Sequence, residues 1–133
     1  MKELPESLRN SREFRRVYER GRRYTTTYFS AFILRTDLSK PRFGLTVTRK
    51  IGNAVIRNRC KRRLRQIVSG FFKDLRSAAV PVESFDLVLN VRSALPGADF
   101  KEVDEAFRTM MERLLRVKSA GEGKPGKDAD GVD

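Results

Sequence analysis

Hydrophobic residues recur at every second position in two segments of this sequence, a pattern that predicts strands. The first segment is Arg42 to Thr48, and the second is Phe85 to Val91, which follows a break at Pro81. Aromatic and β-branched residues also dominate Arg23 to Arg35, so we expect strand structure there, with the connecting turn near Asp37 to Pro41. In the first segment, one side holds Phe43, Leu45 and Val47 and the other holds Gly44, Thr46 and Thr48.

Two segments have the spacing of amphipathic helices that begin with a capping box. Asn10 and Glu13 begin the first, which we predict over Ser11 to Arg20. Asp99 and Glu102 begin the other, near the end of the chain. The buried stripe of this last helix is expected to hold Phe100, Val103, Phe107, Met110 and Leu114.

A third helix is predicted from Asn53 to Phe72, because its apolar residues fall within one arc at about 100° per residue. The expected core-facing stripe holds Ile56, Cys60, Leu64, Ile67 and Phe71. The opposite, solvent-facing side holds Asn58, Lys61, Arg62, Arg65 and Ser69. Arg57 lies at the border, where its aliphatic stem can pack on apolar surface while its head stays in water. Within the apolar stripe, Cys60 is expected to be a buried, inert thiol.

The predicted elements form one small α+β domain in the order helix, strands, basic helix, strand, helix. A chain of 133 residues with 39% hydrophobic residues suits one domain with a modest core. We expect this domain over residues 1–118 and a disordered tail over residues 119–133, where Gly, Lys and Asp replace the apolar residues.

The positive charge of the chain is concentrated in one segment. The formal net charge is +12, from 29 Lys and Arg against 17 Asp and Glu. Between Leu38 and Lys73 there are 11 basic residues and no acidic one. A solvated charged face usually mixes both signs, whereas the repulsion in this segment is uncompensated. The segment therefore predicts a polyanionic partner, and nucleic acid is the expected one.

Residue types that the chain lacks exclude several kinds of chemistry. There is no histidine, which removes the usual general base, imidazole metal ligands and the Ser/His and Cys/His nucleophilic pairs. A single cysteine excludes an internal disulfide framework and agrees with a reducing compartment. No stretch approaches the ~20 apolar residues of a membrane span, and residues 1–10 lack the apolar core of a signal peptide. We therefore expect a soluble cytoplasmic protein.

The longest motif is the run RKIGNAVIRNRCKRRLRQ, which contains Arg57, Asn58 and Arg59 and follows the strand RFGLTVT. Together with REFRRVYERGRR near the N-terminus, it resembles the protein subunit of bacterial ribonuclease P over about residues 8–117. The resemblance implies a ribonucleoprotein in which a large RNA cleaves the 5′ leader from precursor tRNA while the protein assists. It also implies a mixed sheet with a left-handed crossover through the basic helix, against the usual right-handed rule.

The resemblance implies two binding surfaces on the protein and no catalytic residue. The partners would be ribonuclease P RNA and precursor tRNA, with no membrane and no obligate protein partner. Mg²⁺ would be held mainly by the RNA, and the protein would bind no metal firmly. The surface for the catalytic RNA would hold Arg49, Lys50, Asn53, Arg57, Asn58, Arg59, Lys61, Arg62 and Arg65. The surface for the single-stranded leader would hold Phe14, Tyr18, Phe32, Thr46 and Thr48.

The aromatic residues of the second surface have an ordinary alternative. Aromatic side chains at helical spacing are more often core residues than binding residues, so Phe14, Tyr18 and Phe32 could all be buried. On their strand, Tyr28, Ser30 and Phe32 are expected to share one face.

Two other classes of protein fit part of this sequence. A non-enzymatic RNA-binding module, such as a ribosomal protein of similar fold, would share the basic helix but lack the aromatic surface and the full motif. A DNA-binding helix-turn-helix protein would need a second helix beside the basic one, whereas strands flank it here.

Overall fold

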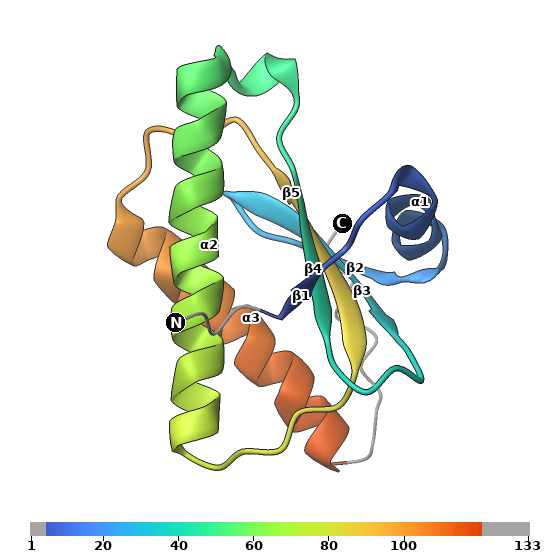
Figure 1. Cartoon of the computed structure of the whole chain (residues 1–133). Coiled ribbons are helices and arrows are strands. Elements are labelled where there is room, and N and C mark those ends of the chain that lie inside the picture. The colour runs from blue at the N-terminus through green and yellow to red at the C-terminus, as the bar shows by residue number, and fades with distance from the viewer. Residues whose placement is uncertain (1–4, 121–133) are drawn as a thin grey trace.

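The computed structural model describes residues 5–120, which fold into a five-stranded sheet with helices on both of its faces (Figure 1). The elements in chain order are β1 (Glu6–Ser7), α1 (Ser11–Arg20), β2 (Arg22–Thr25), β3 (Phe29–Arg35), β4 (Arg42–Thr46), the 3₁₀ helix η1 (Arg49–Ile51), α2 (Ala54–Ser77), β5 (Phe85–Val91) and α3 (Phe100–Ala120).

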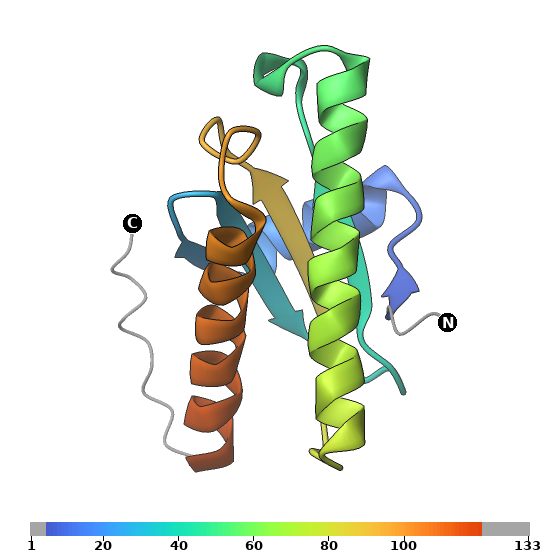
Figure 2. The ribbon, with the colours of Figure 1, turned by 90° about the vertical axis from the view of Figure 1, so that its left-hand side faces the viewer.

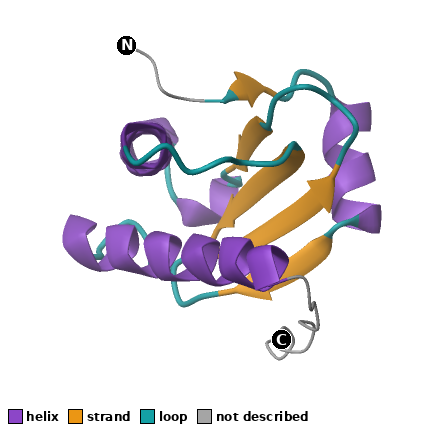
Figure 3. Ribbon diagram, turned by 90° about the horizontal axis from the view of Figure 1, so that it is seen from below, coloured by secondary structure: helices purple, strands orange, loops and turns teal. Residues whose placement is uncertain are grey.

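The sheet is mixed, with the strand order β1-β4-β5-β3-β2. The pairs β1–β4 and β4–β5 are parallel, whereas β3 pairs antiparallel with both β5 and β2. Helices α2 and α3 lie side by side over one face (Figure 2), and α1 covers the other (Figure 3). The expected α+β fold is therefore confirmed. The crossover through α2 joins the parallel neighbours β4 and β5. The left-handedness of this crossover, which the resemblance implies, stays a prediction.

The main core fills the space between the sheet and the helices α2 and α3. The rings of Phe71 and Phe107 meet edge to face with their centroids 5.5 Å apart, and Phe29 of β3 packs 6.3 Å from Phe107. All three rings are buried, so this aromatic group joins both helices to the sheet. A smaller cluster holds α1 on the opposite face through Leu8, Val17 and Val88, with the partly buried Phe14, Tyr18, Phe32 and Leu34 around them.

The capping box predicted for α1 is confirmed, whereas Phe100, expected in the buried stripe of α3, is 39% exposed. Glu13 donates its backbone N–H to the Asn10 side chain at 3.0 Å, and the Glu13 carboxylate accepts from the Asn10 backbone, which completes the capping box. The Asn53 side chain caps α2 by accepting from the backbone N–H of Ile56 at 3.0 Å. The predicted apolar stripe of α2 faces the core, which also takes in Val68, and the helix continues to Ser77.

The segment from Arg23 to Arg35 differs from expectation because a tight turn divides it into β2 and β3. The Thr26 hydroxyl oxygen accepts from the backbone N–H groups of Tyr28 and Phe29, both at 3.1 Å, which stabilises the turn. Tyr28 consequently lies outside β3 and packs against the main core. The expectation that Tyr28 shares a face with Phe32 is therefore wrong, since Phe32 packs beside α1.

The C-terminal boundary of the domain was expected at residue 118. Helix α3 reaches Ala120, and the remainder of the expected tail, residues 121–133, lies outside the described residues.

Candidate RNA interface

The basic face of α2 turns away from the sheet. Asn58, Arg62 and Arg65 are exposed, while Cys60 and Leu64 on the opposite side of the helix are buried in the core. Because the apolar stripe fixes the rotation of the helix, the basic residues must project outward. In the described part of the chain, no carboxylate pairs with any of the cations predicted to contact RNA on this helix, namely Arg57, Arg59, Lys61, Arg62 and Arg65. Their charge is therefore available to an external anion.

The turn before α2 extends this surface. Arg49 and Lys50 are exposed in η1, which the chain leaves at Gly52 with a φ of 152°. A side chain is strained at this φ, so glycine permits the sharp entry into α2. Asn53 follows as the cap of α2, so its side-chain oxygen already accepts a backbone hydrogen bond. We therefore find a structural role for Asn53 in addition to its predicted place at the interface.

The cations of α2 differ in how exposed their side chains are. Arg57 and Lys61 are half-buried, whereas Arg59 is exposed beside a small cavity of about 260 Å³. Arg63, which sequence reasoning left out of the interface, lines the same cavity and donates from Nη1 to the Ala98 carbonyl oxygen at 3.0 Å. This bond ties α2 to the loop before α3, and only the tertiary fold brings these groups together.

Cys60 is a core residue, as expected. Its side chain is 1% exposed, and burial raises the pKa of its thiol more than the nearby Arg63 and Arg59 lower it. A neutral, inaccessible thiol is a poor nucleophile, so Cys60 contributes packing and no chemistry.

The predicted leader surface assembles where α1 crosses the sheet. The Tyr18 hydroxyl and Thr46 Oγ1 lie 2.7 Å apart, and the Tyr18 and Phe32 rings meet edge to face at 4.8 Å. Phe14 packs directly over Gly44, where an added Cβ would lie 2.6 Å from the ring. Four of the five predicted residues therefore share one partly exposed surface. Thr48 is exposed beyond the end of β4, at the start of η1.

Arg23 joins this surface and was not predicted there. Its guanidinium carbon lies 5.7 Å from the centroid of the Phe32 ring, a cation–π contact. The two residues are direct partners in the antiparallel β2–β3 pair. The register of the β2–β3 hairpin would have predicted the contact between Arg23 and Phe32. The turn at Thr26, which sets that register, was not recognised in the sequence. Aromatic rings and a cation thus lie together, a combination that suits stacked bases and their phosphates.

Arg42 belongs to the acid-free segment, yet it is not available to RNA. It donates from Nε and Nη2 to both carboxylate oxygens of Asp86, at 2.9 and 2.8 Å, and from Nη1 to Glu13 at 3.1 Å. Asp86 is 1% exposed and lies opposite Arg42 in the parallel β4–β5 register. The hydrogen bonds with Asp86 raise the pKa of Arg42, and the Arg9 backbone N–H, with Arg42, lowers the pKa of Glu13. This network fastens α1 to the sheet.

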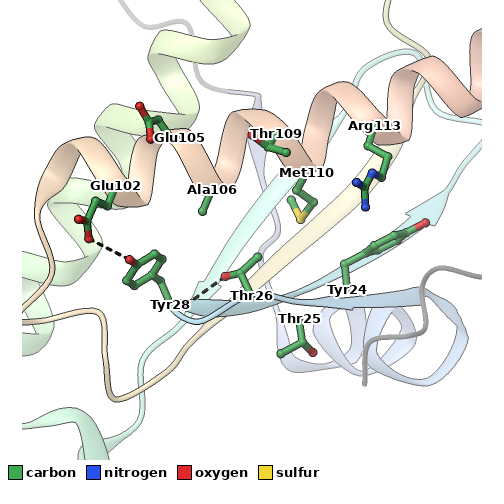
Figure 4. Close-up of a pocket in the computed structure, with 10 residues that line it drawn as sticks. All are labelled: Tyr24, Thr25, Thr26, Tyr28, Glu102, Glu105, Ala106, Thr109, Met110 and Arg113. Atoms are coloured by element: carbon green, nitrogen blue, oxygen red, sulfur yellow. Dashed lines mark hydrogen bonds between the residues drawn. The ribbon is translucent and has the colours of Figure 1, made fainter.

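A larger groove, of about 520 Å³, lies between the β2–β3 hairpin and α3 (Figure 4). Tyr28 donates its hydroxyl to Glu102 at 3.0 Å at one end, which raises the pKa of Tyr28, and Arg113 and Tyr24 lie at the other end. The Glu102 and Glu105 carboxylates line this groove and repel phosphate. We therefore leave it out of the RNA interface.

Two further features concern metals and membranes. The residues that the structure describes contain no group of three or more His, Cys, Asp or Glu side chains that could hold a metal ion. Over the same range, no helix is both long enough and apolar enough to cross a bilayer.

The fold and the charge distribution define a small α+β protein built to contact a polyanion, with a basic helix on one side of its sheet and an aromatic surface on the other. Residues 3–115 match the family model described as Ribonuclease P, so the chain belongs to the ribonuclease P protein family. It is a protein component of the endoribonuclease that matures the 5′ end of tRNA, and it works as a subunit of a ribonucleoprotein. Its RNA partner is ribonuclease P RNA.

Individual relatives agree with this assignment. The ribonuclease P protein component of Desulfovibrio desulfuricans is 37% identical over 118 residues, which cover 85% of this chain and 87% of the relative. That of Acidothermus cellulolyticus is 34% identical over 115 residues and covers 85% and 91%. The structure of the Thermotoga maritima RNase P protein superposes with a TM-score of 0.67 at 30% identity, covering 81% of this chain and 96% of that one.

Proposed function

We propose that the basic face of α2 and the neighbouring turn bind the catalytic RNA, while the surface between α1 and the sheet binds the 5′ leader of precursor tRNA. The observation that carries the first half is the set of outward, unpaired cations on a helix whose other side is locked into the core. Arginine adds planar, forked donors that match phosphate oxygens, so a rigid row of them can engage successive phosphates of a folded RNA.

The leader half rests on the partial exposure of the aromatic surface. Phe14, Tyr18 and Phe32 are half-buried, in contrast to core rings such as Phe71, which is 2% exposed. Each ring packs against the α1 cluster and keeps part of its surface exposed. Stacking on an aromatic ring contributes about 1–3 kcal/mol per base and tolerates any base, which suits leaders of varied sequence.

In this proposal the RNA, and not the protein, carries out the cleavage reaction. The chain has no histidine, and two of its carboxylates, Asp86 and Glu102, are hydrogen-bonded to Arg42 and Tyr28. The Mg²⁺ that activates the attacking water would therefore be held mainly by the RNA, and the protein would supply positive charge beside it. Since precursor tRNA is the substrate, we place the protein in the cytoplasm, without an obligate protein partner.

Reconstitution tests the proposal. At low Mg²⁺, bacterial ribonuclease P RNA should cleave precursor tRNA faster with this protein than alone, because the basic face replaces part of the counterion charge that Mg²⁺ otherwise supplies. A folded protein that gives no stimulation would refute it. Comparison of leader-bearing precursor with mature tRNA separates the two surfaces, since only the aromatic surface depends on the leader.

A further inference from the structure

A small cavity lies where the loop between β5 and α3 meets the N-terminal half of α2 (Figure 2). Its volume of about 260 Å³ is below the range of ~300–1,000 Å³ that is usual for pockets that hold drug-sized ligands, so it suits a single ring system. Ile56, Cys60 and Pro96 line it with apolar surface, and Gly97 lies at its exposed edge. The size of the cavity and its apolar walls therefore suit a flat ring.

The charged groups that line this cavity are two arginines at i and i+4 on α2. Arg59 is exposed, while Arg63 is half-buried and donates from Nη1 to the Ala98 carbonyl oxygen at 3.0 Å. Arg63 keeps further donors on Nε and Nη2. In the described part of the chain neither arginine pairs with a carboxylate, and no Asp or Glu lines the cavity. The cavity thus offers forked donors beside apolar walls, which suits a planar ligand rich in acceptors.

Guanine is the nucleobase that matches these donors best. Its O6 and N7 atoms are adjacent acceptors that one guanidinium can engage together, whereas adenine has an amino donor beside its N7. A base can enter such a cavity only where it is unpaired and unstacked, and unpaired bases are the usual targets of sequence-specific RNA recognition. The groove of Figure 4 differs in this respect, because the Glu102 and Glu105 carboxylates that line it would repel the phosphates on either side of a base.

The cavity is continuous with the basic face of α2. Arg59 lines the cavity and is also one of the residues predicted to contact the catalytic RNA. Arg62 stands three residues further on, as its exposed neighbour on the helix surface. An RNA strand whose phosphates lie on this face can therefore turn one base into the cavity. The leader surface lies beside α1, on the opposite side of the sheet (Figure 1), so the RNA that reaches the cavity is the catalytic RNA.

We infer that the cavity between α2 and the β5–α3 loop binds an unpaired guanine of ribonuclease P RNA. This inference rests on the proposed function, which places the catalytic RNA on α2. It adds a site that reads one base to a surface that otherwise contacts phosphates. The affinity of the protein for the catalytic RNA then depends on the identity of one nucleotide as well as on charge.

The test obstructs the cavity without removing a charge. At Gly97 an added Cβ would meet no atom within 4 Å, so the variant G97L places a bulky side chain at the edge of the cavity without a clash in the loop. The matched control is A94L, which enlarges another exposed residue of the same loop that does not line the cavity. Circular dichroism checks that both proteins fold. Each protein is titrated with bacterial ribonuclease P RNA at several salt concentrations.

G97L should weaken binding of the RNA about 5- to 20-fold, the lower part of the range for one stacked base, because the walls of the cavity are aliphatic. The salt dependence should stay unchanged, since no cation is lost. A94L should bind like the wild-type protein.

A second measurement uses the free wild-type protein and two mononucleotides, GMP and AMP. GMP should shift the amide NMR signals of Gly97 and Ala98 more than AMP does at the same concentration. Both nucleotides carry the same phosphate, so the difference between them reports the base. In G97L this difference should disappear.

Three results would overturn the inference: G97L binds the RNA like wild type, G97L and A94L weaken binding equally, or GMP and AMP give equal shifts at Gly97 and Ala98. A parallel titration with R62A/R65A separates this failure from failure of the proposed function. If R62A/R65A weakens binding while G97L does not, only the base site is wrong. If neither variant weakens binding, the basic face of α2 is not the surface for the catalytic RNA.

Discussion

Replacing Arg42 with Met tests whether the ion-pair network fastens α1 to the sheet. Arg42 is 16% exposed and Asp86 is 1% exposed, so the substitution leaves a carboxylate in the core without its two hydrogen bonds. Breaking a buried pair from one side costs about 3–5 kcal/mol, because the remaining charge stays desolvated. Small domains are stable by about 5–15 kcal/mol, so R42M should lose about a fifth or more of its stability.

The measurement is the free energy of unfolding from urea titrations of wild type, R42M, D86L and the double variant. Replacing a whole buried ion pair with apolar residues of similar volume is close to neutral or stabilising. The double variant should therefore be more stable than R42M, with a coupling of about 2 kcal/mol or more between the two sites. A loss below about 1 kcal/mol in R42M, or additive losses in the double variant, would refute the assignment of Arg42 to structure.

The remaining predictions concern the two RNA surfaces and the α1 cap. Phe14→Ala should weaken binding of leader-bearing precursor more than binding of mature tRNA in holoenzyme titrations; equal weakening for both would favour a purely structural ring. Arg62→Ala with Arg65→Ala should weaken binding to the catalytic RNA and reduce its salt dependence by at most about one unit of slope per lost phosphate contact, whereas an unchanged slope would mean that both side chains face bulk solvent. Glu13→Gln should lower the free energy of unfolding at neutral pH and have less effect in acid. The pKa of Glu13 in the folded state lies below its ordinary value of 4.5. The stabilisation by the Glu13 carboxylate is therefore full above pH 4.5 and is lost as the pH falls through the lowered pKa. Urea titrations of Glu13→Gln and wild type at pH 7 and at about pH 3 check this sign, and a difference that grows in acid would contradict it.

Features that depend on neighbours in the chain were predictable from sequence. The predicted cap at Asn10 follows from a side chain that bonds a backbone group within the same turn. The apolar stripe of α2 and the alternation in β4 follow from helix and strand periods, and each fixes which side of its element is outward. The sequence alone therefore predicts the basic face of α2.

Features that depend on pairing between distant strands were not predictable. In the sequence Arg42 is one of the basic residues of the acid-free segment, and only the parallel pairing of β4 with β5 places it opposite Asp86. Arg23 joins the aromatic surface only because the β2–β3 register places it opposite Phe32.

The sequence by itself determined helix α1, the core-facing stripe of α2, the strands β4 and β5, and the family to which the chain belongs, because these depend on local periods and on a contiguous motif. Only the tertiary structure decided which charges remain free. A cation is available to RNA when no carboxylate from another element reaches it, and that condition depends on how β4, β5 and α1 come together. By this criterion Arg42, a cation of the acid-free segment, is not available to RNA, because Asp86 and Glu13 hold it.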